Sequence, residues 1–248
     1  MNNMNKIIEN YSNKGWVRIN KFISANLVNK INYNLEKFLK KQLHKYDKRH
    51  INFVNNQKLF KNINSFHKLD DCKWIKDFSK KKKVVEIVKK LLNTKSIKLR
   101  QAEYFAKPKK KGLAAPIHQD NFFWNLNDSN ALTIWIALSN SSKKNGGIYY
   151  FDTSHNYGLL PHKKSYMKGT SQTIKNSKFL KSLKKSFPNL KKGDALIHHS
   201  QIVHGSNSNK SNMSRRGVTL QFMTKKAKVD KLKAKNYEKS LLQQINSR

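Results

Sequence analysis

The spacing of apolar residues changes near residue 95, and this change is the strongest constraint on the fold. Before it, apolar side chains recur every three or four residues in 27–39 and 84–92, as on one face of a helix, and Ser24 is a suitable N-cap for the first. After it, short segments follow the pattern of strands, separated by Gly, Pro, Asn and Ser: 97–105, 131–138, 148–151, 195–199 and 217–223. Helices followed by strands predict a mainly β core with flanking helices.

Three other segments are less regular. Residues 15–19 alternate like a short strand, and residues 174–187 are predicted to form a helical insertion that Pro188 closes. Residues 40–80 are polar and lysine-rich with scattered aromatic side chains, and they show no organising pattern.

The length of 248 residues suits one all-β domain with helical additions, or two small domains. We expect a single domain over residues 1–224, with helices to about residue 95 and the β core over about 96–224. The lysine-rich tail over 225–248 is predicted to be a weak helix or a frayed end.

Composition excludes several classes of protein. The single cysteine, Cys72, rules out a disulfide framework and every multi-cysteine metal site. The longest apolar run, 131–138, is far shorter than the roughly 20 residues of a membrane-spanning helix. The first ten residues lack the apolar segment of a signal peptide, so we expect an intracellular, cytoplasmic protein.

The net charge of +38 has two interpretations. A positive surface favours polyanions, because phosphate neutralisation dominates nucleic-acid binding. However, the chain has 46 lysines and only 6 arginines, whereas proteins that read bases depend on the planar arginine fork. Lysine is spread through the whole chain, which favours compositional drift, and we expect no specific nucleic-acid partner.

One combination of residues carries chemistry. On a strand, His118 and Asp120 would face the same side, roughly 6.5–7 Å apart. Downstream lie His204 and, eleven residues later, Arg215. Two histidines and one carboxylate, with open positions opposite, form the facial triad of non-heme Fe(II) oxygenases. In those enzymes the open positions accept 2-oxoglutarate and O₂.

A count of charges supports this interpretation. Fe(II) contributes two positive charges, Asp120 one negative charge and 2-oxoglutarate two negative charges, so Arg215 at the far carboxylate restores neutrality. Guanidinium and carboxylate match bidentately, and an arginine at this position is informative in a chain so rich in lysine.

From about residue 11 to residue 224 the sequence resembles the phytanoyl-CoA dioxygenase family. Four stretches carry the resemblance: NKGWV at 13–17 with FIS at 22–24, KP at 107–108 with HQD at 118–120, NGGI at 145–148 with TSH at 153–155, and GD at 193–194 with HGS at 204–206 and Arg215. The resemblance implies a double-stranded β-helix, or jelly roll, that uses Fe(II), 2-oxoglutarate and O₂.

The resemblance also implies roles for individual residues. His118, Asp120 and His204 would be the iron ligands, and Arg215 would anchor the C5 carboxylate of 2-oxoglutarate. Ser206 and Trp135 would contact the cosubstrate or line its pocket: Ser206 is two residues past His204, and Trp135 is on a strand that borders the pocket in relatives.

Four further residues are candidates for substrate contacts. Gln101 and Phe105 are four apart on one strand and therefore face the same side, and relatives use similar positions. Phe122 and Trp124, with Phe123 between them, would line the substrate entrance or simply pack.

The sequence departs from the family pattern in two places. Asp152-Thr153 replaces the usual Pro-Gly, and His198 stands where an apolar residue is typical. Of His198 and His199, at most one faces the site, and we expect it to be His199. Asp120 is retained, whereas halogenating relatives carry a small residue there, so oxygen insertion is favoured.

These patterns predict a dioxygenase that hydroxylates an unactivated C–H bond of a small molecule and releases succinate and CO₂. The positive surface favours an anionic substrate. Two alternatives remain open: a 2-oxoglutarate oxygenase that acts on nucleic acid or protein, and a non-catalytic jelly-roll binding module. The sequence indicates neither the substrate nor the oligomeric state.

Overall fold

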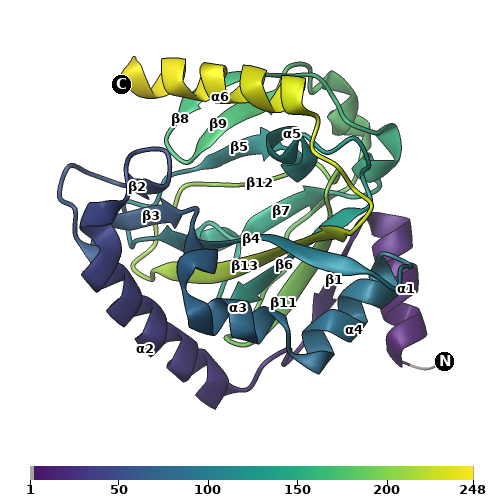
Figure 1. Ribbon diagram of the computed structural model, residues 1–248, viewed down its shortest axis with the longest axis horizontal. Helices are drawn as coiled ribbons and strands as arrows, with labels where there is room; N and C mark the ends of the chain where they lie inside the picture. Colours follow the sequence, from purple (N-terminus) through teal and green to yellow (C-terminus); the bar gives the residue numbers. More distant parts are fainter. Residues whose placement is uncertain (1–2, 248) are drawn as a thin grey trace.

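Two antiparallel sheets form the centre of the molecule in the computed structural model, which describes residues 3–247 (Figure 1). The large sheet has seven strands, in spatial order β1 (Trp16–Ile19), β11 (Ala195–His199), β6 (Ala131–Ala137), β13 (Arg215–Thr224), β4 (Ile97–Lys107), β3 (Ile63–Phe66) and β2 (Ile51–Phe53). The small sheet has four: β10 (Lys185–Ser186), β7 (Ile148–Phe151), β12 (His204–Ser206) and β5 (Ala115–His118). Two packed antiparallel sheets are the architecture expected of a jelly roll.

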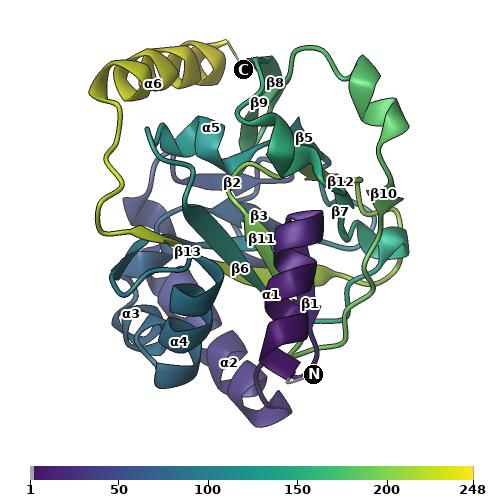
Figure 2. The same cartoon turned by 90° about the vertical axis from the view of Figure 1, so that its right-hand side faces the viewer.

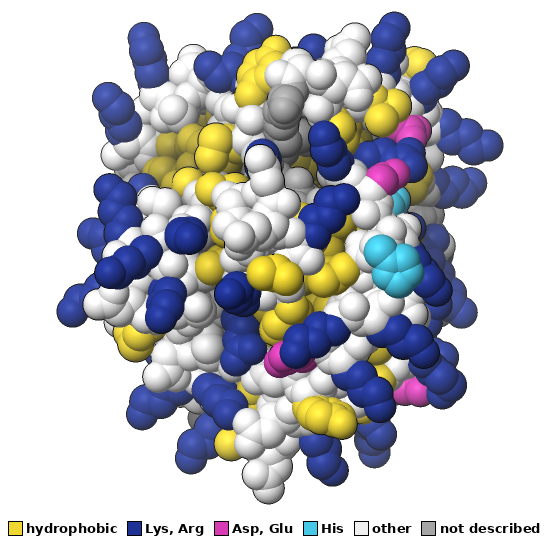
Figure 3. All heavy atoms as spheres, turned by 90° about the vertical axis from the view of Figure 1, so that its left-hand side faces the viewer, with side chains coloured by type: hydrophobic (Ala, Val, Ile, Leu, Met, Phe, Trp, Pro, Cys, Tyr) yellow, Lys and Arg dark blue, Asp and Glu magenta, His cyan; other side chains and the backbone are white. Residues whose placement is uncertain are grey.

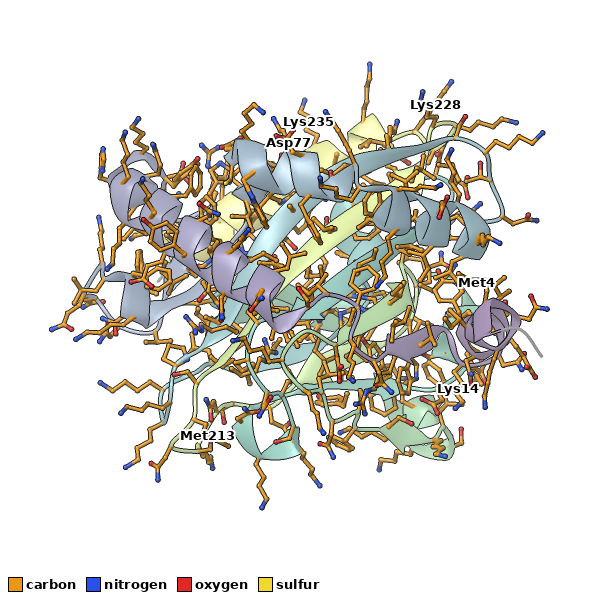
Figure 4. The ribbon with its side chains drawn as sticks, turned by 90° about the horizontal axis from the view of Figure 1, so that it is seen from below. Met4, Lys14, Asp77, Met213, Lys228 and Lys235 are labelled. Carbon is orange, nitrogen blue, oxygen red and sulfur yellow. The ribbon has the colours of Figure 1, made fainter. Side chains whose placement is uncertain are left out.

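The N-terminal helices cover the outer face of the large sheet. They are α1 (Asn3–Lys14), α2 (Ala25–Gln42), α3 (Lys73–Ser79) and α4 (Lys82–Leu91). The predicted cap is confirmed, since the Ser24 side chain accepts a hydrogen bond from the backbone of Leu27. Figure 4 shows helices in front of the large sheet, and Figure 2 shows α1 beside β1. Apolar residues of α2, α3 and α4 share one core with the outer face of the sheet.

The large sheet is buried on both faces, but the two faces differ in chemistry. On β6, the side chains of Leu132, Ile134 and Ile136 belong to the core beneath the helices. Thr133 and Trp135 alternate with them and point to the opposite side, toward the small sheet. A polar face thus lies between the two sheets, while the apolar face holds the helices.

Residues 40–80 extend the large sheet at one edge. They contain the short strands β2 and β3, the helix α3 and three 3₁₀ turns, η1 (Leu43–Lys45), η2 (Phe60–Asn62) and η3 (Leu69–Asp71). Ser65 and Phe66 of β3 pair with Phe105 and Tyr104 of β4. This pairing brings the loops around β2 and β3 to the rim of the space between the sheets.

The second half of the chain adds a cover at the open end of the two sheets. The hairpin β8 (His162–Met167) and β9 (Thr170–Ile174) lies under helix α6 (Lys231–Asn246), at the top of Figure 1. Asp230 caps α6 by accepting a hydrogen bond from the backbone of Lys233. No helix within residues 3–247 combines the length and the apolar character needed to cross a bilayer.

The predicted helical insertion at 174–187 is wrong. That segment contains only a 3₁₀ helix, η6 (Lys178–Ser182), followed by the two-residue strand β10. Its apolar side chains, among them Leu180, pack into a small cluster with Ile174 and Val203, and this packing does not need a regular helix. Two further 3₁₀ turns, η4 (Lys143–Asn145) and η5 (Ser154–Tyr157), flank β7.

Candidate metal centre and cavity

Three side chains converge between the sheets. His204 on β12 lies directly opposite His118 on β5. Asp120 Oδ1 is 3.9 Å from His118 Nε2 and 3.7 Å from His204 Nε2. One ligand atom from each of the three residues falls within 4.8 Å of the others, which suits a single metal ion.

The local structure that joins His118 to Asp120 differs from the predicted strand. His118 is the last residue of β5, and Asp120 is the first residue of the short helix α5 (Asp120–Trp124). The carboxylate therefore reaches the two histidines because the chain turns after β5, and strand alternation is not the reason.

Backbone carbonyls fix both imidazoles in the orientation that a metal needs. His118 Nδ1 donates a hydrogen bond to the Pro116 carbonyl at 2.7 Å, and His204 Nδ1 donates one to the Ile202 carbonyl at 3.1 Å. Each Nε2 is then the unprotonated nitrogen and faces Asp120. Burial also lowers the pKa of His118 and of His204, which keeps both rings neutral and able to bind a metal.

The second oxygen of Asp120 is held by the protein. Oδ2 accepts hydrogen bonds from Thr133 Oγ1 at 2.6 Å and from His198 Nε2 at 3.1 Å. His198 Nδ1 in turn accepts one from the Tyr150 hydroxyl at 2.9 Å. Burial alone would raise the pKa of Asp120, but the His198 hydrogen bond and the neighbouring imidazoles lower it, so the group is a carboxylate with only Oδ1 free.

His198, and not His199, supports the site. The prediction of His199 is wrong because β11 pairs with β6 so that His198 lies opposite Thr133, in the row that faces the space between the sheets. The His199 ring lies against Tyr11 and His155 instead. His198, which departs from the apolar residue typical of the family, therefore orients the carboxylate of Asp120.

Arg215 lies buried at the same end of the cavity. Its Cζ lies over the Trp135 ring, 4.9 Å from the ring centre, and Nε donates a hydrogen bond to the Gly146 carbonyl at 3.2 Å. Gly217 makes room for that ring, because a Cβ there would come within 2.1 Å of Trp135 Cζ2. No carboxylate within residues 3–247 approaches Arg215 to 4.0 Å. Burial lowers its pKa to about 10, so the group is still charged at neutral pH and suits an anionic ligand.

A cavity of about 430 Å³ opens from this centre. The predicted residues that line it are His118, Asp120, His204, Arg215, Ser206, Trp135, Gln101, Phe105 and Trp124. The structure does not bring Phe122 into the cavity: its ring stacks on His162, with ring centres 4.0 Å apart, while Phe123 lines the cavity. The reason is that 120–124 form a helix, in which neighbouring side chains point about 100° apart.

Several further residues line the cavity that are not among those predicted. Arg100, Glu103 and His67 lie on the cavity wall, as do Tyr237 and Leu241 of α6. Of these, Glu103 is predictable from the sequence, because it lies between Gln101 and Phe105 at a spacing of two and therefore shares their face of β4.

The family model for phytanoyl-CoA dioxygenase matches residues 11–217. The chain belongs to this family. Its members are Fe(II)- and 2-oxoglutarate-dependent oxygenases, so the predicted family, enzyme class and cofactors, namely Fe(II), 2-oxoglutarate and O₂, are confirmed. Two neutral imidazoles, one carboxylate and a buried arginine are the side chains that this iron and this cosubstrate need, so the site fits them.

Individual relatives are distant. The Phytanoyl-CoA dioxygenase domain-containing protein 1 of Danio rerio is 30% identical over 146 residues, covering 57% of this chain and 50% of the relative, so this chain spans only half of that protein. The "Probable alpha-ketoglutarate-dependent hypophosphite dioxygenase" of Stutzerimonas stutzeri is 24% identical over 223 residues, covering 86% of this chain and 76% of the relative.

Solved structures confirm the predicted fold. The alpha ketoglutarate dependent carbocyclase SnoK from nogalamycin biosynthesis superposes with a TM-score of 0.73 at 17% identity, over 90% of this chain and 85% of its own. EctD from S. alaskensis, solved with 2-oxoglutarate and 5-hydroxyectoine, gives a TM-score of 0.71 at 18% identity, over 88% and 75%. At these identities the likeness shows the fold alone.

Proposed function

We propose that this protein hydroxylates an unactivated C–H bond of a small molecule, with His118, Asp120 and His204 as its iron ligands. The observation that carries the proposal is the convergence of these three side chains within 4.8 Å, beside a buried arginine that has no acidic partner in the described part of the chain, residues 3–247. The overall reaction converts substrate, 2-oxoglutarate and O₂ into alcohol, succinate and CO₂, and both atoms of O₂ are accounted for in the alcohol and succinate. When bound by these residues, Fe(II) would supply the chemistry that activates O₂.

The side chains have separate tasks in this proposal. His118 and His204 bind through Nε2 and Asp120 through Oδ1, since their other polar atoms are already hydrogen-bonded. Arg215 pairs with the far carboxylate of 2-oxoglutarate and orients it. The Trp135 ring lies beneath the Arg215 guanidinium and Ser206 lines the same cavity, so both border the cosubstrate in this proposal.

Two observations favour a small substrate. A cavity of about 430 Å³ is within the size range of small-molecule sites, roughly 300–1,000 Å³. The lysine and arginine side chains are spread over the face in Figure 3, among apolar and uncharged groups, and do not form a single stripe. The labelled Lys14, Lys228 and Lys235 likewise lie at the periphery in Figure 4. Positive charge that is spread in this way is not typical of a nucleic-acid-binding surface, on which basic side chains cluster on one face.

The proposal is tested by a screen of small metabolites scored by succinate release, repeated with ¹⁸O₂ for every compound that stimulates turnover. We expect one class of compound to raise succinate formation and to gain one ¹⁸O atom as a hydroxyl group. Stimulation by nucleic acid or protein but by no small molecule would contradict the proposed substrate class. Products without added oxygen would contradict hydroxylation.

A further inference from the structure

A β-bulge turns Arg100 into the cavity. Along β13 and β4 the pairing runs regularly to Gln221 opposite Gln101, and then Phe222 lies opposite Leu99, so Arg100 is the extra residue in β4. Regular alternation would have put Arg100 on the helix-covered face, behind Gln101. The bulge places both residues on the cavity side, and bulges often re-aim side chains near active sites.

Two glutamines hold the Arg100 guanidinium in place. Nη1 donates to Gln101 Oε1 at 2.9 Å and to Gln221 Oε1 at 2.8 Å. The same two amides donate to the Glu103 carboxylate, Gln221 to Oε2 at 2.5 Å and Gln101 to Oε1 at 3.3 Å. His67 Nδ1 also pairs with Glu103 Oε1, at 2.6 Å.

These bridging amides keep the two charges apart. Arg100 and Glu103 do not form a direct ion pair within 4.0 Å, although they lie on the same wall of the cavity. Within residues 3–247, Nε and Nη2 of Arg100 donate no hydrogen bond, and the Trp124 ring lies 5.2 Å beneath the guanidinium. One edge of the arginine fork is therefore fixed, and the other is open to a ligand.

The position of Arg100 suits one end of a small substrate. Thr133, which holds Asp120, lies opposite Gln221, and Gln221 lies opposite Gln101. Since adjacent strands are about 4.7–4.9 Å apart, Gln101 and its neighbour Arg100 are roughly 10 Å from Thr133 across the sheet. A single small molecule is long enough to contact Arg100 at one end and to lie near Asp120 and the metal centre at the other.

We propose that Arg100 binds an acidic group of the substrate, a carboxylate or a phosphate, so that the rest of the molecule extends toward the metal centre. This assignment rests on the proposed function. Arg100 is one of only six arginines among 248 residues, and its planar fork matches an oxyanion as lysine cannot. Lys48 and Lys68 line the same cavity near its rim and add a positive field that attracts an anion.

The test is calorimetric titration of the protein loaded anaerobically with Fe(II) and 2-oxoglutarate, so that Arg215 is already occupied. The probes are hexanoate and butyl phosphate, with hexanamide and butanol as their neutral counterparts. We expect saturable binding of at least one acid, at least tenfold tighter than its neutral counterpart. Binding of hexanoate alone identifies a carboxylate substrate, and binding of butyl phosphate alone identifies a phosphate ester.

Variants connect that binding to Arg100. We expect Arg100→Gln to weaken acid binding at least tenfold and Arg100→Lys to restore only part of it. Arg216→Gln removes the same charge from a side chain of β13 that does not line this cavity, and should leave binding unchanged. Equal affinity in wild type and Arg100→Gln, equal affinity for acid and neutral probe, or no saturable binding in wild type would each overturn the assignment.

A second measurement tests the iron and cosubstrate assignment independently of acid binding. The visible band of the Fe(II)–2-oxoglutarate complex is recorded for each protein before the acid is added, and we expect Arg100→Gln to keep it. If the wild type forms no such band, the iron and cosubstrate assignment fails. Acid binding to the metal-free protein, carried out in the Arg215→Leu variant, then still tests Arg100.

Discussion

At both ends of the cavity, side chains are partly hydrogen-bonded to the protein, but at one end they face the proposed metal site and at the other they face the proposed substrate site. At the metal end, made by His118, Asp120 and His204, one polar atom of each side chain is tied to the protein and another faces the centre. At the far end, Arg100 is tied through Nη1 and open at Nε and Nη2. The metal end is built largely from the small sheet and α5, and the far end from β4 and β13 of the large sheet. At both ends, a polar side chain is oriented because some of its polar atoms are hydrogen-bonded to the protein while another stays available to a ligand.

The largest effect should come from the metal end. Asp120→Ala removes one of three ligands, so we expect iron affinity to fall by more than the roughly 10–100-fold that loss of an outer partner costs, and turnover to fall to background. Asp77→Ala, at an exposed carboxylate of α3, is the control. Equilibrium iron binding measures the effect, and near-native affinity in Asp120→Ala would remove this residue from the ligand set.

Arg215 should affect the cosubstrate and spare the metal. A charge-assisted pair is worth about 1.5–3 kcal/mol, so Arg215→Leu should raise the 2-oxoglutarate requirement roughly 10- to 150-fold. Iron affinity should change little, and Arg216→Leu, one residue along but directed to the other face, should behave like wild type. An unchanged cosubstrate dependence in Arg215→Leu would contradict its role.

His198 should have a smaller effect on the metal end. His198→Leu removes one of the two hydrogen bonds to Asp120 Oδ2, while Thr133 still donates the other. We therefore expect a loss in iron affinity of about tenfold, the lower end of the range for such partners. His199→Leu is the matched control, because that ring faces Tyr11 and His155. Equal losses in both variants would mean that the effect is one of general packing.

The smallest effect should come from the rim of the far end. Glu238 of α6 lies 3.9 Å from Arg49 across the cavity entrance, and both side chains are exposed. Removing this negative charge should favour an anion, but exposed pairs contribute little, so Glu238→Ala should raise the affinity for an acidic ligand by less than about fivefold, and salt should reduce that gain. A loss of affinity instead, independent of salt in the calorimetric titration, would show that Glu238 contacts the ligand directly.

The metal end could be predicted from the sequence because its residues lie at spacings that are characteristic of such a site. His118 and Asp120 are two apart, and His204 is followed eleven residues later by Arg215, an arginine in a chain dominated by lysine. Even here the choice between His198 and His199 depended on the register of β11 against β6, which no local pattern contains.

The far end, around Arg100, could not be predicted from the sequence, because its geometry depends on an irregularity in the sheet and on contacts distant in sequence. Arg100 enters the cavity through a bulge, and strict alternation would have assigned it to the opposite face. Phe122 was misplaced because 120–124 form a helix and do not continue the strand. Residues 40–80 contain strands of three and four residues between 3₁₀ turns, which are too short to show a period. These segments are ordered by contacts that are distant in sequence.

The most direct test is an anaerobic titration of the metal-free protein with Fe(II) and 2-oxoglutarate, followed by visible spectroscopy. If His118, Asp120 and His204 hold the metal with Arg215 orienting the cosubstrate, the wild type should form one charge-transfer complex per chain. Asp120→Ala should form none, and Arg215→Leu should form it only at much higher 2-oxoglutarate concentration. A wild type without the band, or an Asp120→Ala variant that keeps it at full intensity, would contradict the account.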